Sequence, residues 1–145
     1  MLCVNNYTKK YIDETRSKVE FQISAYKKLV TTAGSQNGTN ESLLKAAIES
    51  FKPVFFNNMV LVLETYFVHR SRTMEGKDGN PLNEVRILFN SMMNNNNKMC
   101  ADKTIKFNPA KSVLKYQVGD EIKLNKAGFF QLSNAFFAEI ESKYL

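Results

Sequence analysis

The sequence has few cysteines and few histidines, and each scarcity excludes a class of site. It contains two cysteines, Cys3 and Cys100, and one histidine among 145 residues. Two distant thiols in a chain without a secretory signal predict free cysteines in a reducing compartment. One histidine and scattered carboxylates are too few for a zinc ligand set, so we predict no metal site. The chain also lacks the glycine-rich signatures of nucleotide sites, and we predict no cofactor.

Long apolar runs are missing as well. The longest, Met59–Leu63, is followed directly by Glu64, whereas a membrane span needs about 20 apolar residues. The first residues contain neither the basic nor the apolar segment of a secretory signal. We therefore expect a cytoplasmic protein that is not inserted in a membrane.

The residues that are present suit a single folded domain. Hydrophobic residues make up 43% of the chain and aromatic residues 12%, which is enough for one buried core at this length. Twenty basic residues against 14 acidic ones give a net charge of +6. Because the basic residues are spread along the chain among acidic ones, they indicate a mixed polar surface. Nucleic acid, which attracts basic proteins, stays an alternative partner.

The spacing of apolar residues predicts helices in most of the chain. The segment Val54–Arg72 is apolar around nearly its whole circumference, which is typical of a core helix. Pro53 leaves two alternatives before it, a long helix kinked at Lys52 or a new helix beginning at Pro53. Asn80 and Pro81 are typical of a helix start. The predicted helices span residues 7–30, 41–51, 54–72, 81–93 and 126–144.

Shorter patterns predict the remaining segments. Alternating apolar residues on either side of Gly119-Asp120 predict a β-hairpin within residues 104–124. Turn-forming residues predict a flexible loop over 33–40 and another loop over 94–103. The predicted fold is mainly α, a single domain over residues 1–145. It is a bundle of four to five helices with a small β-hairpin before the C-terminal helix.

Polar side chains concentrate where the predicted core helix meets the next helix. His69 is a candidate acid–base catalyst because histidine is the side chain type that most often transfers protons at neutral pH, and in a helix His69 shares one face with Thr65 and Arg72. Glu64, within an apolar run, is either a catalytic acid or half of a buried ion pair with Arg86 or Arg70. Free backbone N–H groups at a helix start and nearby cations predict an anion site. Its candidate ligands are Arg70, Arg72, Lys77, Asn80, Asn83 and Arg86.

The segment Phe67–Arg86 contains His-Arg-Ser-Arg followed by Glu-Gly-Lys-Asp-Gly-Asn-Pro-Leu-Asn-Glu-Val-Arg. It resembles a family of short bacterial proteins that have no assigned activity, and the similarity continues through residues 101–105 and 118–122. The resemblance implies a bacterial cytosolic protein and nothing about a reaction. The helical layout is also similar to the HEPN class of nucleases and nucleotide-binding domains. Their motif, an arginine shortly before a histidine, is absent because His69 precedes Arg70.

Three functions remain as alternatives. The first is a non-catalytic cytosolic binding or assembly protein whose polar corner holds an anionic small molecule, a nucleic acid or a partner. The second is an enzyme acting on a phosphate-containing substrate such as RNA, with His69 as the acid–base group. The third is a structural homo-oligomer joined through aromatic faces that include Phe129, Phe136 and Phe137. Whether the protein is an enzyme is left open by the sequence.

Overall fold

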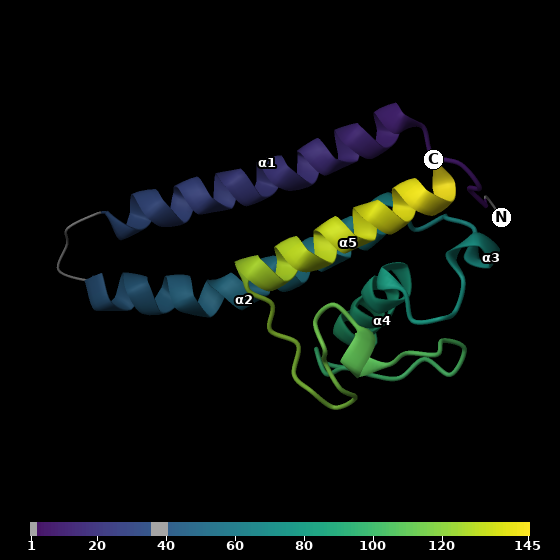
Figure 1. The fold of residues 1–145 in the computed structure, drawn as a ribbon. Helices are drawn as coiled ribbons and strands as arrows, with labels where there is room; N and C mark the ends of the chain where they lie inside the picture. The colour runs from purple at the N-terminus through teal and green to yellow at the C-terminus, as the bar shows by residue number, and fades with distance from the viewer. Residues whose placement is uncertain (1–2, 36–40) are drawn as a thin grey trace.

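The computed structural model describes residues 3–35 and 41–145 and is mainly helical. Two long antiparallel helices, α1 (Lys9–Gly34) and α2 (Glu41–Tyr66), lie beside α5 (Lys126–Tyr144) (Figure 1). The short α3 (Arg72–Glu75) and the longer α4 (Pro81–Asn94) follow α2 and pack against α5. The predicted helical bundle is therefore confirmed at the level of its fold class.

Local sequence signals account for the beginnings of three helices. The side-chain oxygen of Thr8 accepts the N–H of Tyr11 at 3.0 Å and caps α1. Asn80 accepts two N–H groups at the start of α4, and Asn125 accepts the N–H of Gly128 at the start of α5. These caps satisfy backbone donors that have no partner within the helix.

Helix α2 is continuous, with Pro53 inside it. The structure thus contains the long-helix alternative, in which proline removes one backbone hydrogen bond without ending the helix. The helix ends at Tyr66, six residues before the predicted end at Arg72, because the chain then turns and the N–H of Arg70 bonds to the carbonyl of Phe67. Among the described helices, α2 alone is long and apolar enough to cross a membrane, a test that core helices of soluble proteins also pass.

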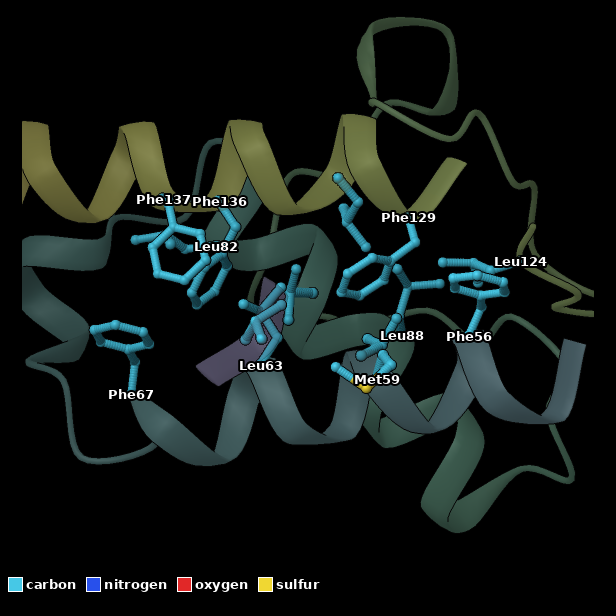
Figure 2. Close-up of a cluster of buried hydrophobic side chains, with 14 of the residues drawn as sticks. Phe56, Met59, Leu63, Phe67, Leu82, Leu88, Leu124, Phe129, Phe136 and Phe137 are labelled. Carbon is cyan, nitrogen blue, oxygen red and sulfur yellow. The ribbon is translucent and has the colours of Figure 1, made fainter. Parts of the chain in front are cut away.

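The core lies between α1, α2, α4 and α5. Phe56, Met59, Leu63 and Phe67 meet aromatic residues of α5 and leucines of α4 (Figure 2). The aromatic residues proposed as an oligomer face, Phe129, Phe136 and Phe137, are at most 3% exposed. Because they are packed inside the monomer, that particular face for oligomer formation is excluded.

The predicted β-hairpin over residues 104–124 is wrong. Within the described chain this region contains turns, a 3-10 helix (Pro109–Lys111) and one isolated bridge, between Lys98 and Glu121. Its backbone donors bond partly to side chains of the helices and partly to backbone carbonyls of other loops, such as those of Lys77, Asn97 and Met99. The carboxylate of Glu84 accepts the N–H groups of residues 113 and 114, and the amide oxygen of Asn57 accepts that of Leu124.

The structure describes the first of the two predicted loops in part and the second in full. Helix α1 continues through Gly34, so the loop predicted over 33–40 begins later than its sequence suggests. Residues 36–40, the rest of the first predicted loop, lie outside the described residues. Residues 95–103 contain turns and the bridge at Lys98.

Candidate functional site

The polar corner predicted from the sequence is built by three segments that follow α2. The chain turns at residues 67–71, forms α3, and enters α4 through a glycine-containing loop. Two residues of α5 support this corner: the hydroxyl of Tyr144 donates to the carbonyl of Ser71 at 2.7 Å, and Lys143 donates to the carbonyl of Glu75 at 2.7 Å. Burial raises the pKa of Tyr144 to about 12, which keeps the hydroxyl protonated as a donor.

A network of four charged side chains and one amide side chain, here called the ionic cluster, holds the segments of the corner together. It consists of Glu64, Arg70, Glu75, Asn83 and Arg86. Arg70 is at its centre, with a guanidinium that is fully buried. It donates to Glu64 at 3.0 Å and to Glu75 at 2.9 Å, and also to the backbone carbonyls of Phe67 and Leu82. These bonds compensate for the loss of hydration that burying a charge requires.

Glu75 is the carboxylate with the most donors in the ionic cluster. Arg86 donates to both of its oxygens, at 2.6 and 3.1 Å, in the two-pronged geometry that suits guanidinium and carboxylate. The amide of Asn83 donates to it at 2.7 Å. The start of α4 thus fixes the position of α3, although the latter is a single turn long.

Burial and charge act in opposite directions on the carboxylates of the corner. Burial raises the pKa of Glu64, with Arg70 and Arg86 opposing the rise. At Glu75 burial also favours the neutral acid, but the hydrogen bond from Arg86 and the charges of Arg70 and Arg86 outweigh it and lower the pKa. Burial raises the pKa of Glu84, which lies apart from the cluster and accepts two backbone N–H groups.

A hollow of about 330 Å³, here called the cationic hollow, opens beside the ionic cluster. Three arginines and the one histidine line it together with small polar and apolar groups. No carboxylate occurs among its lining residues in the described part of the chain. The lining residues are Cys3, Val68, His69, Arg70, Ser71, Arg72, Thr73 and Arg86.

The structure brings together part of the predicted site. His69, Arg70, Arg72 and Arg86 share the cationic hollow. The predicted helical face through Thr65, His69 and Arg72 does not exist, because α2 ends before His69. His69 is nevertheless exposed at the hollow.

The other predicted residues have different surroundings. Asn83 donates to Glu75 within the ionic cluster, and Asn80 caps α4. Lys77 is exposed on the loop before α4 and does not line the hollow. Glu64 is 1% exposed and held by Arg70, so its contacts favour the ion-pair alternative over a catalytic acid.

Sequence reasoning missed several groups of this site. Glu75, which accepts hydrogen bonds from both Arg70 and Arg86, is not among the predicted site residues. Ser71 and Thr73, which bring hydroxyl groups to the hollow, were not predicted. A signal for Ser71 existed, because serine is a preferred N-cap and its side chain accepts the N–H of Met74.

A second concavity is larger but chemically less selective. It has a volume of about 510 Å³ and follows α2 past Pro53 and Asn57 to the segment 121–123. Its ionisable groups, Glu49, Glu121 and Lys123, include both signs of charge. Among the described residues no group of three or more histidine, cysteine or acidic side chains could hold a metal ion.

No family model, no curated protein and no solved structure matches the chain. The resemblance of the segment from His69 to Arg86 to a bacterial family therefore stays a prediction.

Proposed function

We propose that the protein is a non-catalytic binding protein that holds an anionic group, such as a phosphate, in the cationic hollow. The observation that carries this proposal is the composition of the lining, three arginines and a histidine without a carboxylate among the described residues. Guanidinium groups bind phosphate and carboxylate oxygens through paired donors. An anion is thus the ligand chemistry that this lining favours.

The net positive charge of the arginines and carboxylates at this corner supports the proposal. Glu64 and Glu75 face three guanidiniums, those of Arg70, Arg72 and Arg86, which leaves one positive charge in excess. The excess resides mainly on Arg72, since its side chain is 47% exposed and its Nε lies 3.9 Å from Glu75. Arg86 also keeps donor capacity, because its Nη1 is 3.8 Å from Glu64, beyond hydrogen-bond distance.

The arginines of the cationic hollow differ in how firmly they are held, and this difference suits ligand binding. Arg86 is held by Glu75, so little entropy is lost when it meets a ligand. Arg70, whose guanidinium is fully buried, holds Glu64 and Glu75 in place and does not itself contact a ligand. Arg72 extends over the hollow from α3 and can turn toward an incoming anion. The hydroxyls of Ser71 and Thr73 add uncharged donors on the same side.

A second candidate function is an enzyme that acts on a phosphate-containing substrate such as RNA. One observation favours it: His69, an acid–base group, lines the same hollow as the arginines that would hold the phosphate. Glu64 has no part in this candidate, because Arg70 holds it inside the ionic cluster. Loss of phosphodiester cleavage in His69→Asn, with folding unchanged, would favour this candidate over simple binding.

The proposal is tested by titrating inorganic phosphate at constant ionic strength and following the melting temperature. A ligand that binds only the folded state raises that temperature with concentration. We expect a rise for the wild type and for Lys77→Ala, which removes an exposed cation outside the hollow, and a much smaller rise for Arg72→Ala. An equal rise in all three proteins, or none in the wild type, contradicts the proposal.

A further inference from the structure

Among the residues that the structure describes, no other element covers the outer part of the α1–α2 hairpin, here called the arm. It comprises residues 27–34 of α1 and 41–55 of α2, beyond the last buried residue of α1, Tyr26, and before the first of α2, Phe56. None of these residues is buried. In Figure 1 the arm extends past the beginning of α5. Packing against neighbours supplies most of a helix's stability in water, so the arm lacks what the rest of the hairpin has.

Apolar side chains are nevertheless present throughout the arm. Leu29 is 65% exposed, Leu43 70% and Phe51 46%. A hollow of about 270 Å³ lies between the two helices, and Val30, Leu44 and Ile48 are its apolar residues. The arm is thus an apolar surface without a partner among the described residues.

The hollow of the arm continues the groove that α5 fills nearer the core. Lys45, Glu49 and Lys52 line the hollow of the arm. They are four and three residues apart, and Phe56 follows four residues later, so all of them lie on the same face of α2. Phe56 packs on Phe129 of α5, with ring centroids 6.2 Å apart. The arm therefore presents the face that a third helix covers further along the hairpin.

Charges along this face alternate in sign. The order is Glu41, Lys45, Glu49, Lys52, and all four residues line the hollow. In an antiparallel dimer, a two-fold axis crosses the row midway between Lys45 and Glu49, at the level of Ala47 along the helix. This axis places Glu41 opposite Lys52 of the second copy and Lys45 opposite Glu49. Each of the four charges then meets one of opposite sign, whereas a parallel two-fold placement would set every residue against itself.

The charges of the row are free to change partners. Glu49 and Lys52 form an ion pair at 2.8 Å within the monomer, and both side chains are more than 40% exposed. Exposed pairs of this kind contribute little to stability, so exchanging this contact for one across an interface costs little.

We infer that the arm is a homodimer interface in which two copies pack antiparallel into a four-helix bundle. The apolar residues Val30, Leu44 and Ile48 form the centre of the interface, and the alternating charges of α2 form its rim and set its direction. Charge complementarity of this kind selects the partner and its register. This inference is independent of the anion site, which lies at the opposite end of the molecule (Figure 1).

The test is a charge swap followed by sedimentation analysis across a range of protein concentrations. Lys45→Glu sets like charges against Glu49 at two symmetric places, and we expect the dimer dissociation constant to rise about tenfold or more. The double variant Lys45→Glu, Glu49→Lys restores opposite charges in the antiparallel arrangement and should recover dimerisation. Lys103→Glu, the same change at an exposed position outside the arm, is the control.

Ile48→Glu provides a second test, because it places a charge in the apolar centre of the interface and should weaken the dimer. Circular dichroism checks that each variant stays helical. A wild type that is monomeric up to millimolar concentration overturns the inference. So does a dimer that resists both Lys45→Glu and Ile48→Glu, or one that the charge swap fails to restore. Binding of a monomeric wild type to lipid vesicles, abolished by Ile48→Glu, would also overturn it and assign the arm to a membrane surface.

Discussion

Arg70 makes hydrogen bonds to two carboxylates and two backbone carbonyls while its guanidinium has no contact with water. Arg70→Ala would leave Glu64 and Glu75 buried with an incomplete set of partners. We expect a loss of about 3–5 kcal/mol in the free energy of unfolding, measured with urea. Arg72→Ala, which removes a half-exposed guanidinium 3.9 Å from Glu75, should lose less than about 1 kcal/mol. Similar losses for the two variants would refute a structural role for the cluster.

The opposite pKa shifts of Glu75 and Glu84 predict opposite pH dependence. The pKa of Glu75 is lowered from 4.5, so its contribution to stability is full above the unfolded-state pKa and is lost as pH falls through the folded-state value. The pKa of Glu84 is raised from 4.5, so its contribution is full below 4.5 and is lost as pH rises through the folded-state value.

Urea unfolding between about pH 3 and pH 7 separates the two effects. The stability of the wild type relative to Glu75→Gln should increase as the pH rises. Relative to Glu84→Gln it should decrease over the same range. Two slopes of the same sign would show that the surroundings of one of these carboxylates have been misassigned.

Single residues of the corner were predictable where chemistry left few alternatives. A carboxylate within an apolar run needs a partner, and the predicted pairing of Glu64 with Arg70 or Arg86 is confirmed by separations of 3.0 and 3.8 Å. The role of Glu75 was not predictable, because an acid beside a glycine-rich loop normally faces water. Its burial depends on the one-turn helix α3, which no periodicity can reveal.

At the scale of elements, the loop between α3 and α4 contains two glycines with a positive φ, Gly76 and Gly79, of which Gly79 is the more closely packed. Gly79 has a φ of 89°, and a Cβ there would lie 2.6 Å from the carbonyl oxygen of Lys106. Gly79→Ala should therefore lower the free energy of unfolding by about 1–3 kcal/mol, measured with urea. In the control Gly34→Ala, a Cβ would meet nothing within 4 Å, and we expect a change within about 1 kcal/mol. Equal effects would contradict the close approach at Gly79.

Elements with caps and a helical period were predictable, and the segment before α5 was not. The boundaries of α4 and α5 follow from Asn80, Pro81 and Asn125. In residues 104–124 the alternation correctly marks buried positions such as Ile122 and Leu124. It does not reveal where the backbone N–H groups bond. Here three of them bond to side chains on α2 and α4, and others bond to loop carbonyls such as those of Asn97 and Met99.

The whole molecule has two ends with different properties. The ionic cluster and the cationic hollow lie at the end where α2 stops, and the uncovered arm lies at the other (Figure 1). The helix lengths indicate that α5 leaves part of the hairpin uncovered, since α1 and α2 have 26 residues each and α5 has 19. At about 1.5 Å per residue, the shorter helix cannot cover the full hairpin. Which end stays uncovered depends on where α5 begins, and only the three-dimensional structure gives that.

The most direct test of the central claim is an NMR titration of the isotope-labelled protein with inorganic phosphate. If the cationic hollow binds anions, backbone amide signals of Ser71, Arg72 and Thr73 shift and saturate together, while those of the arm stay constant. Arg72→Ala should weaken the response without altering the fold. Shifts that are absent, or that spread evenly over exposed lysines without saturating, would contradict an anion site at this corner.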